Sequence, residues 1–154
     1  MLRKEKNIKL FLNYLIFYKM AATKKNGTSL LLYTGSDAIA ASKSHSLSVN
    51  SESIDVTTKD SAGWKEILPG LKSWTVDCEG LVAFDNAFNY EYLLDALRNR
   101  TKLSIKLETT VVGDERLKGD VYVTSVELSA PQEDAISFTA SFEGTGALTH
   151  ETIT

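Results

Sequence analysis

Strict alternation of apolar and polar residues is the feature that most limits how this chain can fold. In residues 72–79 the apolar Trp74, Val76 and Cys78 alternate with Ser73, Thr75, Asp77 and Glu79. Successive side chains of a β-strand point to opposite faces, so this stretch predicts a strand with one face in the core and one against water. Residues 101–109, 119–130 and 136–143 show a similar period. The sequence therefore predicts a mainly antiparallel β domain.

One segment follows the helical period instead. Within residues 89–102, apolar residues recur at spacings of three and four, at Tyr90, Leu93, Leu94 and Leu97. Residues at these spacings share one face of a helix, and Asp85 and Asn86 upstream are candidate capping residues. We expect a single α-helix here, between two of the strands.

Two further stretches predict strands: the compact apolar residues 29–34, and residues 38–49, where Leu47 and Val49 alternate with serines. The apolar face switches within 119–130, which predicts a β-bulge near Thr124 and Ser125. In total we expect six or seven strands and one helix in one domain, residues 20–154.

The two ends of the chain are expected to differ from this domain. Gly144 and Gly146 follow the last strand pattern, so residues 144–154 are expected to form a flexible tail. Residues 1–19 begin with basic residues and continue into LFLNYLIFY, which resembles the start of a signal peptide, but no small-residue cleavage motif follows and the run is too short to span a bilayer. We interpret them as upstream sequence read in frame, with translation starting at Met20. A tethering, signal or disordered extension is the alternative.

The longest predicted connection joins two strands through residues 50–71, NSESIDVTTKDSAGWKEILPGL. Structureless connections are uncommon beyond about 12–15 residues, and this one carries apolar side chains that would be costly to leave uncovered. We interpret the segment as an arm that docks on another subunit, with Trp64 as its anchor; a Trp64 that packs on its own domain is the alternative. The residues assigned to this interface are Ile54, Asp55, Val56, Thr57, Thr58, Lys59, Asp60, Trp64, Ile67 and Leu68.

Charge is unevenly distributed along the 154 residues, which carry a formal net charge of −3. Residues 1–19 hold five basic residues and one acidic residue, so the remainder has 12 basic and 19 acidic residues. Binding to nucleic-acid phosphates needs Lys and Arg to displace counterions. An acidic body therefore argues against a DNA-gripping surface, although DNA could pass nearby without binding.

No group of residues predicts catalysis or a metal site. Cys78 is the only cysteine and lies on an apolar strand face, which predicts a buried thiol. His45 and His150 have no neighbours at ligand spacing. Asp77 and Glu79 are spaced as a glycosidase pair could be, but alternation places such pairs on any solvated strand face. We expect no enzyme activity, no cofactor and no metal.

A series of segments, in order along the chain, is similar to a known family. The segments are NGTSLLLY, IAASKSHSLSVNSESIDVTTKDSAGWKEILPG, KSWTVDCEGL, the predicted helix and SFTASFEGTGAL. With them, residues 26–148 resemble a major tail tube protein of long-tailed bacteriophages, of the type found in lactococcal and related siphophages. The most specific piece is IDVTTKDS (54–61) followed by Gly63 and Trp64. Residues 1–19 fall outside the resemblance.

The resemblance implies a β-sandwich or half-barrel with one flanking helix. It implies a structural subunit that polymerises as stacked hexameric rings around a lumen through which the phage genome leaves without specific binding. Implied partners are further copies of the chain and the tail initiator or tip, tape-measure and terminator proteins. The implied location is the virion tail, and the host cytoplasm during assembly, with no membrane.

Three other functions remain as alternatives. The tube of a contractile injection or secretion machine would have a similar fold. A monomeric, lipocalin-like small-ligand binder would need an apolar cavity and short loops, which the long arm disfavours. An enzyme would need a buried pocket with converging acids.

Overall fold

The structure is a computed structural model that describes residues 25–35, 37–39, 41–83 and 88–154. The predicted extension, residues 1–19, lies outside this part of the chain. Seven strands pair antiparallel in a single sheet, in the order β2-β1-β5-β6-β7-β4-β3. The strands are β1 (Leu31–Thr34), β2 (Asp37–Ala38), β3 (Ser42–Asp55), β4 (Ile67–Leu81), β5 (Leu103–Glu108), β6 (Glu115–Ser129) and β7 (Ser137–Thr152). The described helices are α2 (Tyr90–Arg98) and the 3₁₀ turns η1 (Gly27–Ser29) and η2 (Lys59–Ser61).

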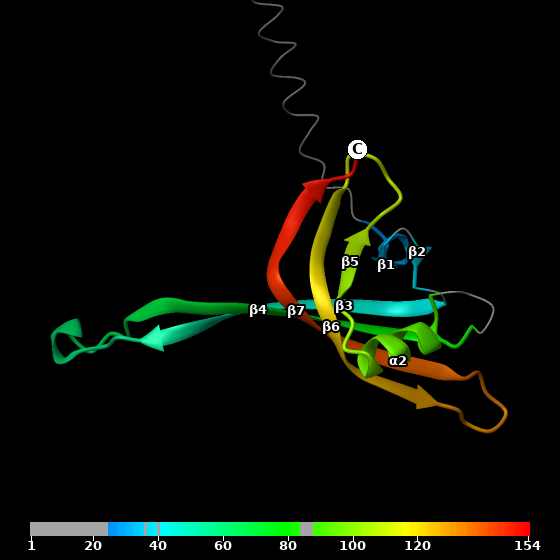
Figure 1. The fold of residues 1–154 in the computed structure, drawn as a ribbon. Coiled ribbons are helices and arrows are strands. Elements are labelled where there is room, and N and C mark those ends of the chain that lie inside the picture. Colours follow the sequence, from blue (N-terminus) through cyan, green and yellow to red (C-terminus); the bar gives the residue numbers. More distant parts are fainter. Residues whose placement is uncertain (1–24, 36, 40, 84–87) are drawn as a thin grey trace, which may run out of the picture.

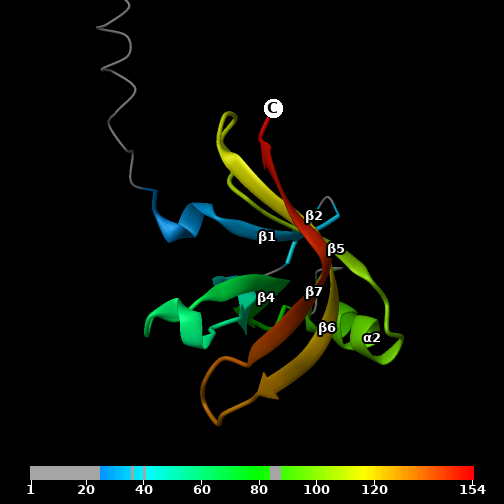
Figure 2. The same ribbon diagram turned by 90° about the vertical axis from the view of Figure 1, so that its left-hand side faces the viewer.

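In the part of the chain that the structure describes, the prediction of a mainly antiparallel β fold with one α-helix is confirmed. Of the two forms that the resemblance implies, the single curved sheet corresponds to the half-barrel, with β2 and β3 at its open ends. β6 and β7 bend along their length (Figures 1 and 2). Their register shifts between Val123 and Ser125, which is the predicted bulge, and again between Lys118 and Asp120. Bulges increase local twist and bend a strand, so these two shifts account for the bend.

The core fills the side of the sheet that α2 covers. Its largest fully buried side chains come from five strands and the helix: Phe138, Phe142, Leu32, Leu93, Ile105, Val76 and Val121. The helix adds Leu93 and Ala96 to this core and packs along β6 (Figure 2). The predicted capping residues Asp85 and Asn86 lie outside the described part of the chain. Within it, the Asn89 side chain caps α2 by accepting hydrogen bonds from the Glu91 and Tyr92 amides at 3.0 and 3.3 Å.

The expectation of a flexible tail at residues 144–154 is wrong. β7 continues through Thr152 and pairs with β6 as far as Glu115, and Ile153 exchanges backbone hydrogen bonds with Gly113 and Asp114. Gly144, one of the two glycines that suggested a chain break, has a packing role instead. A Cβ at Gly144 would overlap the Trp74 ring, so the strand can run past this buried indole only with glycine there.

The expectation that residues 50–71 form a long loop between two strands needs a correction, because most of the segment belongs to the strands themselves. β3 runs to Asp55 and β4 starts at Ile67, so most of the segment is a two-stranded ribbon. Between Ser51 and Ser53 the register advances by two residues in β3 but by three in β4, from Lys72 to Pro69. Gly70 therefore lies in a bulge. Proline is compatible with a strand at a bulge or at an unpaired edge, which explains why Pro69 does not end β4.

Candidate assembly surface on a projecting hairpin arm

Residues 50–73 form a hairpin, here called the arm, that extends beyond the body of the sheet (Figure 1). β4 pairs with β7 only over Thr75–Leu81, so the preceding part of β4 has β3 as its one partner strand within the described chain. A two-stranded ribbon on its own is marginally stable in water. The arm is therefore a part of the fold that gains stability when another surface covers it.

Side-chain and backbone hydrogen bonds hold the two strand ends together at the tip of the arm. The Val56 amide donates to the Glu66 carbonyl oxygen at 3.0 Å, and the Glu66 amide donates to the Thr57 hydroxyl at 2.9 Å. The Thr57 amide donates to the Asp55 carboxylate at 2.9 Å. Hydrogen bonds from the Thr57 hydroxyl and amide lower the pKa of Asp55, so this carboxylate is charged at neutral pH.

The short η2 turn completes the tip and orients Trp64. The Thr58 amide donates to the Ser61 hydroxyl at 3.1 Å, and the Ser61 amide donates back to the Thr58 carbonyl oxygen at 3.1 Å. Ala62 and Gly63 take positive φ values of 49° and 84°, which reverse the chain. The Trp64 amide then donates to the Ser61 carbonyl oxygen at 2.9 Å. This network fixes the backbone that carries the indole before any partner binds.

The apolar side chains of the arm are exposed to an unusual degree. Trp64 and Leu71 are each 79% exposed, and three more are over half exposed: Ile54, Ile67 and Leu68. Ile54 and Leu68 are directly paired across the two strands, so they form one apolar contact surface. The alternative in which Trp64 packs on its own domain does not hold at this exposure. Large exposed apolar patches are typical of interaction sites.

All ten residues assigned to the interface from sequence lie on the arm. Ile54 and Asp55 end β3, Ile67 and Leu68 begin β4, and the others form the tip: Val56, Thr57, Thr58, Lys59, Asp60 and Trp64. Sequence reasoning did not single out Leu71, because it was counted only as the end of a loop. It also missed Val111 and Val112, which are 48% and 74% exposed between β5 and β6.

The face of the sheet opposite the core is polar. Asp77, Glu79 and Glu143 are exposed on it, beside the hydroxyl residues of β3 and β7. The Asp77 carboxylate accepts hydrogen bonds from the hydroxyls of Ser141 at 2.7 Å and Ser46 at 3.5 Å. A shallow pocket of about 310 Å³ lies over these strands. Among the described residues, no three His, Cys, Asp or Glu side chains are grouped so that they could hold a metal ion.

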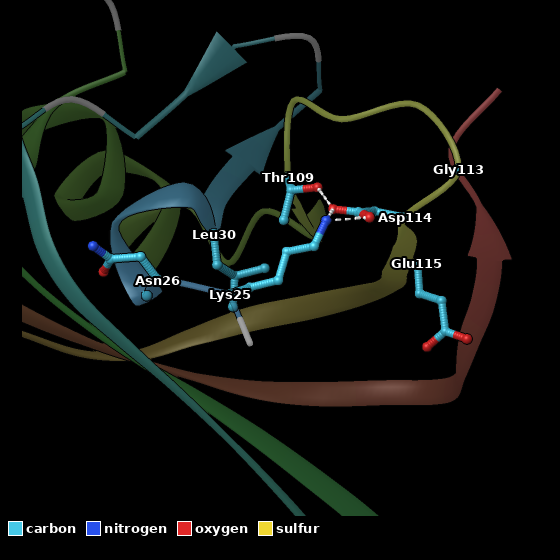
Figure 3. Close-up of a pocket in the computed structure, with 8 residues that line it drawn as sticks. Lys25, Asn26, Leu30, Thr109, Gly113, Asp114 and Glu115 are labelled. Atoms are coloured by element: carbon cyan, nitrogen blue, oxygen red, sulfur yellow. Dashed lines mark hydrogen bonds and ion pairs between the residues drawn. The ribbon is translucent and has the colours of Figure 1, made fainter. Parts of the chain in front are cut away.

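A second pocket, of about 450 Å³, lies between the N-terminal part of the described chain and the β5–β6 connection (Figure 3). Lys25 forms an ion pair with Asp114, and the Thr109 hydroxyl donates to the same carboxylate. These hydrogen bonds, first that from Lys25 and then that from Thr109, lower the pKa of Asp114. Through these two partners, the Asp114 carboxylate joins the N-terminal part of the described chain to the β5–β6 connection.

His45 in β3 and Cys78 in β4 lie in an environment that disfavours their charged forms. His45 is paired with Cys78 across the strands, and burial lowers its pKa. Burial, and then the charge of Glu79, raise the pKa of Cys78 to about 12. This thiol is buried, as the alternation predicts, and is therefore a poor nucleophile.

In the described part of the chain, none of the helices has the length and apolar character needed to cross a membrane.

Comparison with known proteins identifies the family. No curated protein sequence gives a significant match. Among solved structures, the chain is similar to one from the virion of a native gene transfer agent particle, with 23% identity, a TM-score of 0.72 and coverage of 84% of this chain and 100% of that chain. It is also similar to the SPP1 tail tube, with 15% identity, a TM-score of 0.70 and coverage of 85% and 81%.

A third similar structure is the sheath–tube complex of an extracellular contractile injection system, with 13% identity, a TM-score of 0.65 and coverage of 86% of this chain and 95% of that chain. At these identities the three structures show a shared fold. Family membership rests on a sequence model: residues 24–150 match the model described as phage tail tube protein. The match spans most of the domain, arm included, and the chain belongs to the phage tail tube protein family.

Proposed function

We propose that this chain polymerises as stacked hexameric rings into a tail tube, and that the arm makes the contacts between copies. The observation that carries this proposal is the arm itself, whose tip is held in place by hydrogen bonds while its apolar side chains remain open to water. One of the solved structures with this fold is a gene transfer agent tail with C6 symmetry, at 24% identity and a TM-score of 0.72. Head-to-tail contacts of one surface with a different surface build rings and filaments.

The physical gain on assembly comes from covering these side chains. Full burial of a Leu or Ile side chain contributes about 1.5–3 kcal/mol, and tryptophan is strongly enriched among residues that dominate binding energy. The tip is already ordered by its hydrogen bonds, so less conformational entropy is lost when it docks. The arm therefore has the features of an anchor between subunits.

The polar face supports a role as a conduit. Asp77, Glu79 and Glu143 carry like charge to phosphate, and the hydroxyls between them keep the surface wet. This part of the face, over β4 and β7, repels a passing nucleic acid, whereas Lys106 and Lys118 are paired on the same face over β5 and β6. We propose that this face, opposite α2, lines the lumen and that the genome passes along it without specific contacts.

The other parts of the proposal follow from a tube function. A tube of defined length needs proteins that start it, measure it and end it, so the chain would contact a tail tip or initiator, a tape-measure protein and a terminator. It would be found in the virion tail, and in the host cytoplasm while tails are assembled. Its role is structural rather than enzymatic.

The experiment that tests this function removes the arm without disturbing the register of β3 and β4. Ser51 and Lys72 are directly paired, so residues 52–71 can be replaced by a two-residue Asn-Gly turn between them. We expect the intact chain to form rings or tubes in negative-stain electron microscopy as its concentration rises. The shortened chain should remain a folded monomer by circular dichroism and analytical ultracentrifugation. A shortened chain that still forms tubes would contradict the role of the arm.

Two alternatives have distinct outcomes in the same experiment. A lipocalin-like ligand binder would stay monomeric at every concentration; its closed barrel also differs from the open sheet described here. A tube of a contractile machine would polymerise like a tail tube, since the fold is shared with such a system. Co-expression with a sheath protein separates the two, because only a contractile tube would become coated by a sheath.

A further inference from the structure

Two lysines face each other on the polar side of the sheet, in the half formed by β1, β5, β6 and the end of β7. Lys106 in β5 is paired directly with Lys118 in β6. Ile105 and Leu107 flank Lys106 and are buried, and Gly119, next to Lys118, is buried as well. Alternation therefore places both lysines on the face opposite the core. Like charges directly opposite each other on two strands repel and destabilise the pairing.

The facing lysines lack the acidic partners that the other cations of this half have. Lys102 forms an ion pair with Asp120 at 2.8 Å, and Arg116 forms one with Glu108 at 3.3 Å. The hydrogen bond from Lys102 is the first cause that lowers the pKa of Asp120, and the charge of Lys118 is the last. The facing lysines form no ion pair with any residue that the structure describes. Their repulsion is therefore not offset within this part of the chain.

The register extends the pair into a row across four neighbouring strands. Tyr33 of β1 is paired with Lys106, and Thr149 of β7 is paired with Lys118. These four residues are here called the lysine row. Adjacent strands lie about 4.8 Å apart, so the row spans about 14 Å. Neither lysine lines the two pockets described above. An open row of this length suits an extended anionic polymer better than a small molecule, which needs a concave site.

The rest of the polar face has the opposite charge. Asp77, Glu79 and Glu143 lie there. Glu127 lies there too, since Thr139 is paired with Glu79 on one side and with Glu127 on the other. The register shift that follows the facing lysines separates the two halves of the face. An anionic polymer that moves along this face meets repulsion over the acidic half and attraction at the lysine row.

We infer that the lysine row binds backbone phosphates of the nucleic acid that passes through the tube. The inference rests on the proposed function, which places this face on the lumen. Duplex DNA carries one negative charge per about 1.7 Å of its axis, whereas an extended acidic polypeptide has at most one per about 3.3 Å. Nucleic acid is therefore the polyanion that best neutralises two facing ammonium groups. Phosphate contacts carry no sequence information, so every part of a genome meets the same weak contact, repeated once per subunit.

Assembly of tubes in the presence of DNA tests this site. The chain is assembled with a short fluorescent DNA duplex at low salt, about 50 mM, where phosphate contacts are strong. Electron microscopy first establishes that tubes form, and pelleting then measures the DNA that they retain. Acetylation of lysines by an N-hydroxysuccinimide ester, analysed by mass spectrometry with and without DNA, shows which lysines the duplex protects.

Three double variants separate the row from net charge. Lys106→Gln/Lys118→Gln removes both ammonium groups, and Lys106→Arg/Lys118→Arg keeps the charge. Arg98→Gln/Arg100→Gln is the control, because it changes the net charge equally at two exposed positions at the end of α2, on the core side of the sheet. The glutamine variant of the row should form tubes but lose most of the bound DNA. The arginine variant and the control should retain it.

In wild-type tubes, DNA should protect Lys106 and Lys118 from acetylation more than it protects the other lysines. The slope of log affinity against log salt should fall by about 0.9 for each phosphate contact that is lost. Wild-type tubes that bind no DNA, or glutamine-variant tubes that bind as much as the control, would overturn the inference and leave the tube function intact. Displacement of DNA by poly-L-glutamate at equal total charge would assign the row to an acidic polypeptide instead. A wild-type chain that forms no tubes would overturn the proposed function and the inference with it.

Discussion

The indole Nε1 of Trp74 donates a hydrogen bond to the Gly146 carbonyl oxygen at 3.1 Å, which ties the base of the arm to β7. The ring itself packs against the backbone of Gly144 in β7 and of Gly119 in β6. Trp74 is only 4% exposed, whereas Trp64 at the tip is 79% exposed. The two tryptophans of the chain thus lie at the buried base and at the exposed tip of the arm. Substituting each of them should therefore have a different effect.

Replacing Gly144 by alanine should destabilise the fold. The added Cβ would overlap the Trp74 ring, which is buried and cannot move without breaking its bond to Gly146. Overpacking of this kind costs about 1–3 kcal/mol of unfolding free energy. Gly27→Ala is the matched control, since nothing lies within 4 Å of a Cβ there. Guanidinium unfolding of the monomer at low concentration measures both, and equal midpoints would contradict the packing described here.

Substitution of Trp74 should lower the stability of the fold, whereas substitution of Trp64 should impair assembly. Trp74→Ala removes a buried indole and its hydrogen bond, so it should cost about 3–5 kcal/mol of unfolding free energy. Trp64→Ala removes an exposed side chain and should change unfolding by no more than about 0.5 kcal/mol, yet abolish or strongly weaken tube formation. Chemical denaturation and electron microscopy of the same samples give both values. Wild-type tube formation by the Trp64→Ala variant would contradict the assignment of Trp64 as an anchor.

The strand pattern could be predicted from sequence because alternation is local. In residues 72–79 and 101–109, the order of apolar and polar residues itself shows which side chains face the core. Both stretches form strands of the sheet. The bulge near Thr124 was predictable for the same reason, since it shifts the alternation itself. The helix α2 was predictable for the same reason, because its apolar residues recur at spacings of three and four within the segment itself.

The two corrected expectations have a common physical cause. Gly144 and Gly146 suggested a chain break, and residues 50–71, which contain Pro69 and Gly70, suggested a connection, because glycine and proline disfavour a strand locally. In the fold, Gly144 makes room for a side chain 70 residues away in sequence, and a bulge opposite Glu52 accommodates Gly70. Both depend on which strands pair, which local sequence does not encode. The exposure of the arm was predictable, whereas the pairing of Ile54 with Leu68 across its two strands needed the register.

The Lys25–Asp114 ion pair should weaken in acid. The folded state lowers the pKa of Asp114 below its ordinary value of 3.8. A lowered carboxyl pKa gives stability that is fully present above the unfolded value and is lost as the pH falls through the folded one. A double-mutant cycle with Asp114→Asn and Lys25→Gln should therefore show a small favourable coupling, constant between pH 5 and pH 8 and declining below about pH 3.8. A coupling that stays constant down to pH 2, or that falls between pH 8 and pH 5, would contradict this assignment.

The Cys78 thiol should resist modification until the sheet opens. Burial, and then the charge of Glu79, raise the pKa of Cys78 to about 12, so at pH 8 about one thiol in 10⁴ is ionised even before access is considered. The side chain is 3% exposed between strands that pair on both sides, β3 and β7. Labelling by Ellman's reagent should then follow the opening of these strands, and Gly144→Ala should accelerate it by the same factor by which it raises the unfolded population. The shortened-arm chain, which leaves this pairing intact, should label at nearly the native rate. Rapid labelling of the native protein would show that β3 separates from β4 in the folded state, and would contradict the protection of Cys78 described here.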